Sequence, residues 1–424
     1  MQLRDHRWTV GLTIAVALLA ASCSGDDDAD DSSATTTAAA STESTSGGAA
    51  GSTVPATGAS SDSTAASTGE AIDDTTPAVE GETTLRFSLD ELLAGTEGAP
   101  PSDGPPAQPD KSVWVISCGE AVPSCVGPTA GAMEAGEAIG WDMTLFDGQL
   151  DPTRYGEGIR QAIAAGADGV VIAAIDCRVA EAPLREANAA GVTVVAFYSI
   201  DCEEPTFDAE VQFNGYEGLD TSYATVVADW GASKARYLID ALDGDVRVIS
   251  YREDDLQAVT SIYEGFEREL ATCSTCEIVE TIEFTFPDLL TPTGLRDQTA
   301  AAIQAHPEAN ALHSLYDGMS LLGLSQAVLD SGRNDEILMI GGEGFAPNLD
   351  LIRGNLGQDA AMAFPANWTG WDSIDTMNRL LAGEPNANSG NGWRIIDAGV
   401  NMPASGGYEP DVDYRAAYTA IWAG

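Results

Sequence analysis

The chain has 424 residues, of which 66 are acidic and 19 are Lys or Arg, so its formal net charge is −47. This balance excludes nucleic acid as a partner, because phosphate binding requires a basic surface. Two explanations of the acidity stay open: solubility in a salty habitat, or attraction of a cationic ligand.

The first 23 residues have the pattern of a signal peptide. Arg4 and Arg7 precede an apolar run over residues 10–21, which is too short to span a bilayer, and small residues then precede Cys23. The stretch before Cys23 resembles a bacterial lipobox, which implies an acylated cysteine and a lipid anchor outside the cytoplasm. An ordinary signal peptide with an unmodified cysteine is the alternative. No second apolar run of about 18 residues follows, so the body is not expected to cross a membrane.

The next segment, residues 24–110, is expected to be a disordered acidic tether. Up to about residue 84 it is rich in Ser, Thr, Ala, Gly and Asp, and such a composition cannot bury enough apolar surface to offset the entropy lost on ordering. Near its end, Ser88 and Glu91 can cap one short helix, and several prolines then interrupt regular structure.

The body then alternates strands and helices. A first lobe is predicted over residues 111–213, with strands over 112–117, 141–146, 169–175 and 192–198 and helices over 129–140, 151–166 and 183–190. The uninterrupted apolar strand at 169–175 is typical of a parallel strand covered on both faces. The alternation predicts a doubly wound α/β lobe.

A second lobe of similar plan is predicted over residues 214–363. Its expected strands are 245–251, 276–284, 311–316, 337–341 and 360–364, and its expected helices are 223–242, 261–270, 295–305, 320–329 and 349–353. Residues 364–424 are expected to return to the first lobe, with a helix over 369–381, and to make a last crossover. The predicted fold class is therefore α/β, with two doubly wound parallel-sheet lobes joined by crossover hinges.

Several short motifs follow one another between about residues 112 and 402. They are LDP at 150–152, ADGVVI at 167–172, ANAAGVTVV at 187–195, GF at 265–266, HPEANAL at 306–312, YDG at 316–318 and GGEG at 341–344. Their order resembles type I periplasmic binding proteins, especially the ribose-binding-like branch of sugar receptors. The resemblance implies a monomeric receptor without a cofactor, which captures a sugar or related polyol between its lobes and delivers it to an ABC permease.

Ligands of open α/β sheets bind beyond the carboxyl ends of the strands, and an interlobe cleft is the default pocket. The candidate ligand-binding residues are Ser117, Glu120, Asp176, Tyr198, Ser199, Asn214, Arg252, Asp317, Glu343 and Phe364. The resemblance gives Asp317 the place of a ligand-binding aspartate, although it can also cap the helix that follows. Glu343 can hold a hydroxyl, an ammonium group or only Arg252. Tyr198 and Phe364 make the pocket more aromatic than in the sugar receptors, which suits an apolar sugar face or a cation.

Six cysteines in the body are expected to form disulfides outside the cytoplasm. The proposed pairs are Cys118–Cys125, Cys177–Cys202 and Cys273–Cys276, although six cysteines permit many connectivities. Cys273 and Cys276 have the spacing of a redox pair, but their place in a helix-to-strand turn favours a structural disulfide.

Catalysis and metal binding find little support in the sequence. The nucleophile elbow, the His-Glu-x-x-His motif and the phosphate-binding loop are missing. His6 lies in the leader, and His306 and His313 stand apart without the spacing of metal ligands, so neither an enzyme nor a metal site is expected. Two other functions stay open: a ligand-sensing receptor of the same fold coupled to a membrane signalling protein, and a hydrolase that uses Asp317 with Glu343.

Overall fold

A computed structural model describes residues 85–216, 222–291 and 293–424, all within a unit that spans residues 76–424. The expected signal peptide, the lipidation site Cys23 and the tether up to residue 84 lie outside the described residues. Within the described part, no helix is both long and apolar enough to cross a bilayer.

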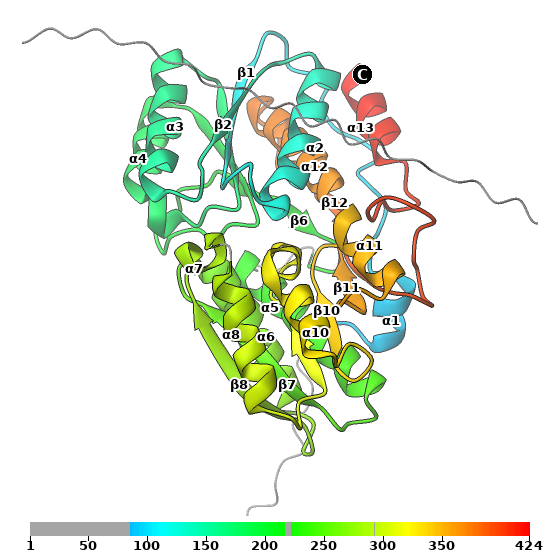
Figure 1. The fold of residues 1–424 in the computed structure, drawn as a ribbon. Helices are drawn as coiled ribbons and strands as arrows, with labels where there is room; N and C mark the ends of the chain where they lie inside the picture. Colours follow the sequence, from blue (N-terminus) through cyan, green and yellow to red (C-terminus); the bar gives the residue numbers. More distant parts are fainter. Residues whose placement is uncertain (1–84, 217–221, 292) are drawn as a thin grey trace, which may run out of the picture. The chain divides into compact units, whose positions relative to one another are not determined.

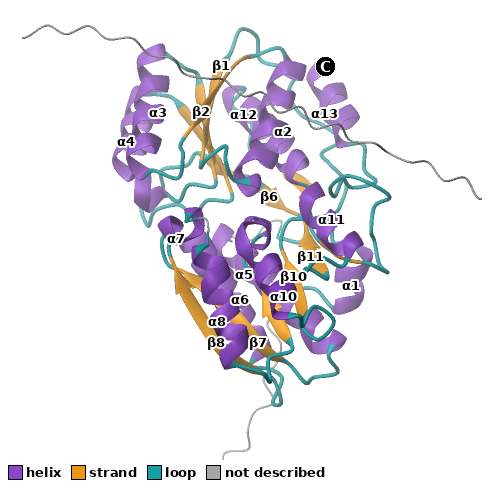
Figure 2. Ribbon diagram, in the orientation of Figure 1, coloured by secondary structure: helices purple, strands orange, loops and turns teal. Residues whose placement is uncertain are grey.

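The first lobe is built on a parallel five-stranded sheet (Figures 1 and 2). Its strand order is β2 (Asp142–Asp147), β1 (Ser112–Ser117), β3 (Gly169–Ala173), β4 (Thr193–Phe197) and β5 (Ala209–Glu210). Helices α3 (Pro152–Ala165) and α4 (Cys177–Ala190) pack together on one face, whereas α2 (Pro123–Ile139), α12 (Ala366–Leu381) and α13 (Tyr414–Ala423) form the other layer. Every residue of β3 is buried, as a doubly covered strand requires.

The second lobe has a six-stranded sheet. The strand order is β13 (Arg394–Asp397), β11 (Ala360–Ala363), β10 (Leu338–Gly341), β9 (Ala311–His313), β7 (Arg247–Glu253) and β8 (Glu277–Phe284), and only β13 runs antiparallel to its neighbour. Its helices are α5 (Tyr223–Ala241), α6 (Gln257–Leu270), α7 (Phe286–Leu290), α8 (Gly294–Ala305), α9 (Asp317–Met319), α10 (Ser325–Ser331) and α11 (Ala346–Gly354), with a π-helical turn over Ser320–Leu324. The predicted fold class is confirmed.

Most predicted elements agree with the structure to within a few residues, and two helices start earlier than expected. Helix α2 begins at Pro123, because proline is tolerated in a first helical turn. Helix α4 begins at Cys177 and includes a non-helical residue, Ala180, where two helical pieces join. The short elements α7, β5, β6 (Gln212–Phe213), β12 (Asn388–Asn391) and β13 were not predicted, since so few residues carry no clear periodicity. Helix α13 was also missed, although Tyr414, Tyr418 and Trp422 recur at helical spacing on its buried face.

The chain passes between the lobes at several points. Strands β6 and β12 pair with each other in a separate two-stranded sheet at two of these crossovers. The expected boundaries after residues 213 and 363 fall at the ends of β6 and β11. The return over residues 364–424 includes β13 in the second lobe and α13 in the first.

Residues 85–110, here called the strap, pack on the folded unit, whereas the sequence predicted a tether as far as residue 110. The capping box of Ser88 and Glu91 is present and starts α1 (Leu89–Ala94), which packs against β13 and α5. Leu92 is fully buried, and the ring of Phe87 meets that of Trp393 edge-on at 5.5 Å. Apolar burial therefore holds a segment whose overall composition indicates disorder.

The strap runs from the second lobe to the first. The backbone N–H of Thr96 donates to the carbonyl of Trp393 at 3.0 Å, and that of Gly98 donates to Gly390 at 2.8 Å. Further along, Ala107 donates to the carbonyl of Trp422 in α13 at 3.0 Å. The strap therefore adds one more connection across the hinge.

The six cysteines form the three expected disulfides, with Cα–Cα distances of 5.7 Å for Cys118–Cys125 and 5.3 Å for both Cys177–Cys202 and Cys273–Cys276. The first two fix loops at the carboxyl ends of β1 and β4. The third closes the turn between α6 and β8, as expected of a structural bridge.

Candidate functional site

A cavity of about 100 Å³ lies between the two lobes. Its lining residues from the first lobe are Cys118, Val122, Ser124, Cys125, Leu150, Ala174 and Tyr198. The second lobe and the crossover contribute Tyr223, Val227, Trp230, Leu256, Ala258, Val259, Ile262, Phe286, Leu289, Tyr316, Glu343 and Phe364. The cavity is thus an interlobe site with a largely apolar lining.

The cavity lies where the strands of both sheets end. Cys118 directly follows β1, Tyr198 follows β4 and Phe364 follows β11. Ala174 and Tyr198 have φ angles of 55° and 53°, in the left-handed region that is unfavourable for residues other than glycine. The surrounding fold therefore holds the backbone of the cavity wall in a strained conformation, which is common at binding sites.

Four aromatic residues, Tyr198, Tyr223, Trp230 and Phe364, form what we call the aromatic wall. The ring centroid of Tyr198 lies 5.0 Å from that of Phe364 and 5.9 Å from that of Tyr223, and Trp230 lies 5.4 Å from Phe364. The hydroxyl of Tyr198 is fixed by a hydrogen bond of 2.7 Å to the hydroxyl of Thr369 on α12. The wall thus presents π surfaces from both lobes and from the crossover.

Glu343 is the charged member of the described lining. It follows β10, and its Oε2 accepts a hydrogen bond of 2.6 Å from the backbone N–H of Asp317. Its Oε1 accepts no hydrogen bond from the described residues, and the side chain is only 6 % exposed. Glu343 therefore has acceptor capacity left for a ligand donor.

Asp317 holds the loop that carries Glu343. Its Oδ1 accepts from the N–H of Gly342 at 2.8 Å, and its Oδ2 accepts from Gly344 at 2.7 Å and Phe345 at 2.9 Å. The carboxylate is fully buried and does not line the cavity, and it does not cap the helix that follows. Burial, and then the Glu343 carboxylate, raise the pKa of Asp317.

Lys234 on α5 places a buried ammonium group behind the wall, a feature that sequence reasoning missed. Its Nζ donates to the carbonyls of Ser314 at 3.1 Å and Leu315 at 2.7 Å, and lies 3.6 Å from the ring centroid of Trp230. Burial lowers the pKa of Lys234 to about 7, although Glu343 and Asp317 favour its charged form. Lys234 lies at helical spacing from the apolar residues Val227, Trp230 and Leu238 of α5, and this spacing was the available signal.

Asp176 joins the lobes rather than lining the cavity. Its Oδ1 accepts from the N–H of Ile200 at 2.8 Å, and its Oδ2 accepts from Gln257 at 2.6 Å and Ala258 at 3.2 Å, at the start of α6. A carboxylate at a helix N-terminus is stabilised by the helix dipole. Burial nevertheless raises the pKa of Asp176. We call this contact the interlobe latch.

The other candidates do not line the cavity either, and each has a partner elsewhere. Ser117 accepts from the N–H of Gly119, Glu120 accepts from the Thr129 hydroxyl, Ser199 donates to the carbonyl of Phe197, Asn214 donates to that of Thr96, and Arg252 pairs with Asp254. Of the ten candidates, the structure thus brings together Tyr198, Glu343 and Phe364 in the lining. Arg252 is not the partner of Glu343.

Much of the apolar lining went unnoticed in the sequence. Tyr223, Trp230 and Ile262 lie on the helices α5 and α6, where amphipathic periodicity indicates core. Tyr316 lies at the end of a predicted strand. That position, at a carboxyl end where ligands bind, could have identified it as a lining residue. Side chains on helices enter the site because α5 and α6 begin at the cavity.

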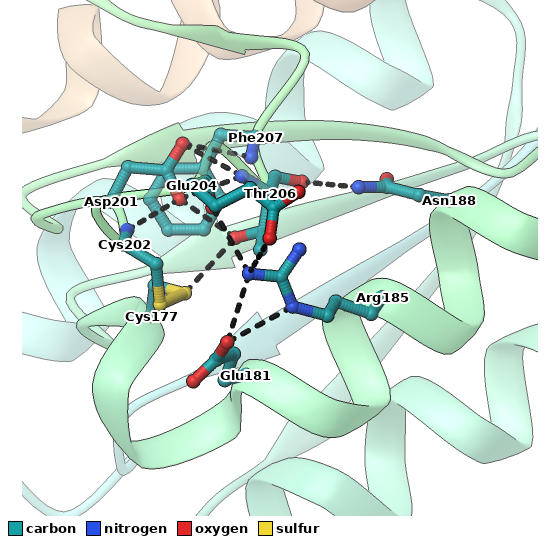
Figure 3. A network of polar contacts seen from close by, with 9 residues as sticks. All are labelled: Cys177, Glu181, Arg185, Asn188, Asp201, Cys202, Glu204, Thr206 and Phe207. Atoms are coloured by element: carbon teal, nitrogen blue, oxygen red, sulfur yellow. Dashed lines mark hydrogen bonds and ion pairs between the residues drawn. A yellow bond between two sulfur atoms is a disulfide. The ribbon is translucent and has the colours of Figure 1, made fainter.

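A polar cluster beside the site stabilises the loop after β4 (Figure 3). The Asp201 carboxylate accepts from the N–H groups of Cys202 at 2.8 Å, Thr206 at 2.9 Å and Phe207 at 3.1 Å. Cys177, Cys202 and Asp201 lie close enough to suggest metal ligands, but the two sulfur atoms are joined in a disulfide. The cluster therefore has a structural role.

Comparison with known proteins places this architecture in a family. The model of the periplasmic binding protein domain matches residues 125–385. No curated protein matches the chain.

Solved structures share the fold at low identity. A glucose–galactose binding protein from Geobacillus stearothermophilus is 16 % identical, with a TM-score of 0.58 over 70 % of this chain and 100 % of its own. The binding protein of the arabinose ABC transporter from Shewanella sp. ANA-3 is 17 % identical, with a TM-score of 0.58 over 73 % and 95 %. An ABC transporter solute-binding protein from Mycobacterium smegmatis with bound glycerol is 20 % identical, with a TM-score of 0.57 over 71 % and 100 %. Since the family match spans more than half of the chain and the fold agrees, the chain belongs to the periplasmic binding protein family, with the type I arrangement of two α/β lobes.

Proposed function

We propose that the protein is an extracytoplasmic receptor that captures a small organic solute between its lobes and delivers it to an ABC importer. The observation that carries this proposal is the interlobe cavity, which lies at the carboxyl ends of both sheets and is lined from both sides. Sugars and polyols are the first solutes to test, because similar structures bind glucose or galactose, arabinose and glycerol.

The lobes are arranged for closure around a solute. Crossovers join them, and the latch of Asp176 on α6 forms only when they approach. Hinge closure of this kind is the usual motion of two-lobed binding proteins. A binding receptor needs no reacting groups, so we propose no catalytic role for Asp317 or Glu343.

We further propose that acylated Cys23 anchors the receptor and that the acidic segment after it is a tether. Supporting this are the basic start, the short apolar run and the lipobox-like stretch before Cys23. Replacement of Cys23 by Ser is expected to move the protein from the membrane fraction to the medium or periplasm. Retention in the membrane fraction would contradict the anchor.

A thermal-shift screen tests the receptor function. Sugars, polyols, amino acids and small amines are added to the full chain without its leader, and one class is expected to raise the melting temperature. Saturation at about 100 times Kd adds about 2.7 kcal/mol to the free energy of unfolding. Absence of any stabilising solute would contradict the proposal.

A pair of variants shows whether the solute occupies the cavity. Phe364→Leu alters the aromatic wall and is expected to reduce the solute-induced shift in melting temperature, measured against its own unliganded melt. Phe207→Leu removes a similarly buried ring outside the cavity and is the matched control. An equal reduction in both variants would place the solute elsewhere.

A further inference from the structure

We propose that the solute is a small organic ammonium compound with an apolar body, bound by the aromatic wall and Glu343. This inference rests on the proposed receptor function and narrows its solute class. The supporting observations are the composition of the lining, the balance of buried charges and an unpartnered hydroxyl.

The lining offers few polar groups to a ligand. Among the described residues it contributes the Glu343 carboxylate and the hydroxyls of Ser124, Tyr198, Tyr223 and Tyr316, and it has no amide, guanidinium or imidazole group. A sugar carries hydroxyls around its whole edge, and each one that is buried without a partner weakens binding. The cavity therefore matches a solute with an apolar body and one polar end.

Beside the cavity, the buried carboxyl groups outnumber the buried basic groups of the described residues. Glu343 and Asp317 are both at least nine-tenths buried, and Lys234 is the basic group buried beside them. Arg252 pairs with the carboxylate of Asp254, and Arg178 donates to the backbone carbonyl of Asp254. An uncompensated buried charge is costly. A ligand cation beside Glu343 would favour the charged form of both buried carboxyl groups.

The aromatic wall is suited to the same charge. Cations bind over aromatic faces within about 6 Å of the ring centroid, most strongly where water is excluded. The molecule already uses this interaction, since the ammonium of Lys234 lies 3.6 Å from the ring centroid of Trp230. Tyr198, Tyr223 and Phe364 present further rings to the cavity.

The hydroxyl of Tyr316 independently indicates a missing partner. Tyr316 lines the cavity and is only 8 % exposed, yet its hydroxyl has no hydrogen-bond partner among the described residues. The hydroxyl of Ser124, also in the lining, likewise has no partner in the part of the chain that the structure describes. Buried polar groups are normally paired, so these hydroxyls are expected to contact the polar group of a bound solute.

Calorimetry with matched probes tests the charge. The full chain without its leader is titrated with choline, with its neutral isostere 3,3-dimethylbutan-1-ol, and with galactose. Choline is expected to bind at least about 10-fold more tightly than the isostere, since only the charged probe gains from the cation–π contacts and from the carboxylate. Equal affinity for choline and the isostere, or binding of galactose alone, would overturn the inference and leave the receptor function intact. Failure of every solute in the wider screen would overturn both.

Two variants assign the effect to the named groups. Glu343→Gln keeps the shape and the hydrogen bond from Asp317 but removes the charge, so it is expected to abolish the preference for choline over the isostere. Glu264→Gln, the same change at an exposed position of the second lobe, is the control and is expected to keep the preference. If Glu343→Gln keeps the preference while its melting curve shows a folded protein, the inference is overturned.

Discussion

The two rims of the cavity are held by different kinds of interaction. In the first lobe, the disulfides Cys118–Cys125 and Cys177–Cys202 fix the loops after β1 and β4 covalently. In the second lobe, the loop after β10 is held by the buried carboxylate of Asp317, and the third disulfide lies in the turn between α6 and β8. The first rim should therefore respond to reductants, and the second to changes of pH and charge.

The largest expected loss of stability comes from removing the carboxylate that holds the second rim. Asp317→Asn places an amide NH₂ group among three backbone N–H donors, so we expect the free energy of unfolding to fall by about 3 kcal/mol or more. Urea denaturation of the unliganded protein measures the change. Asp350→Asn at an exposed ion pair is the control, with an expected change within about 0.5 kcal/mol. Similar losses in the two variants would show that Asp317 does not hold the rim.

The next largest loss of stability comes from removing a disulfide that holds the first rim. Replacing Cys118 and Cys125 together by Ser removes a bridge with a sequence separation of 7, and we expect a loss of about 2 kcal/mol together with weaker solute binding. The matched double variant at Cys273 and Cys276 removes a bridge with a separation of 3, so its stability loss should be smaller and its solute affinity unchanged. Equal affinity losses would mean that the first bridge has no special effect on the cavity.

The stability of the second lobe is expected to depend on pH, which distinguishes it from the disulfide-held first rim. Burial, and then Asp255, raise the pKa of Glu253 from its ordinary value of 4.5 to about 8. Between these values the folded protein keeps a proton that the unfolded chain loses, so stability should fall as pH rises from about 5 to about 8. Glu253→Gln removes the titrating group, so the loss of stability across the window is expected to become smaller. Thermal melts at several pH values measure it, and an unchanged slope would contradict the raised pKa.

The smallest effect concerns the contact between the rims. Asp176→Asn weakens the interlobe latch on α6, and we expect solute affinity to fall about 5-fold, which corresponds to about 1 kcal/mol. The unliganded radius of gyration, measured by X-ray scattering, should increase. An unchanged radius and affinity would show that the crossovers alone set the closed position.

Local pattern in the sequence predicted most strands, most helices and all three disulfides. Uninterrupted apolar runs such as 169–175 identify central strands, and the capping box at Ser88 is a short-range signal. These features depend on near neighbours in the chain. They were therefore accessible without the structure.

The direction in which polar side chains point could not be predicted. Asp317 and Asp176 both follow strands as a binding residue should, yet backbone N–H groups from distant loops engage their carboxylates. The aromatic wall combines residues that lie far apart in the chain, from Tyr198 to Phe364, and the burial of Lys234 depends on carbonyls about 80 residues away. Such contacts arise from packing between elements, which a single sequence does not encode locally.

The strap gives the hinge a mechanical property. The described chain begins at Leu85 beside the second lobe, passes β12 and reaches α13 of the first lobe. A pull that arrives at Leu85 is therefore resisted by α1 and by the backbone bonds of Thr96 and Gly98 before it reaches β1. Tension applied at this end must therefore break the contacts of the strap before it acts on the hinge.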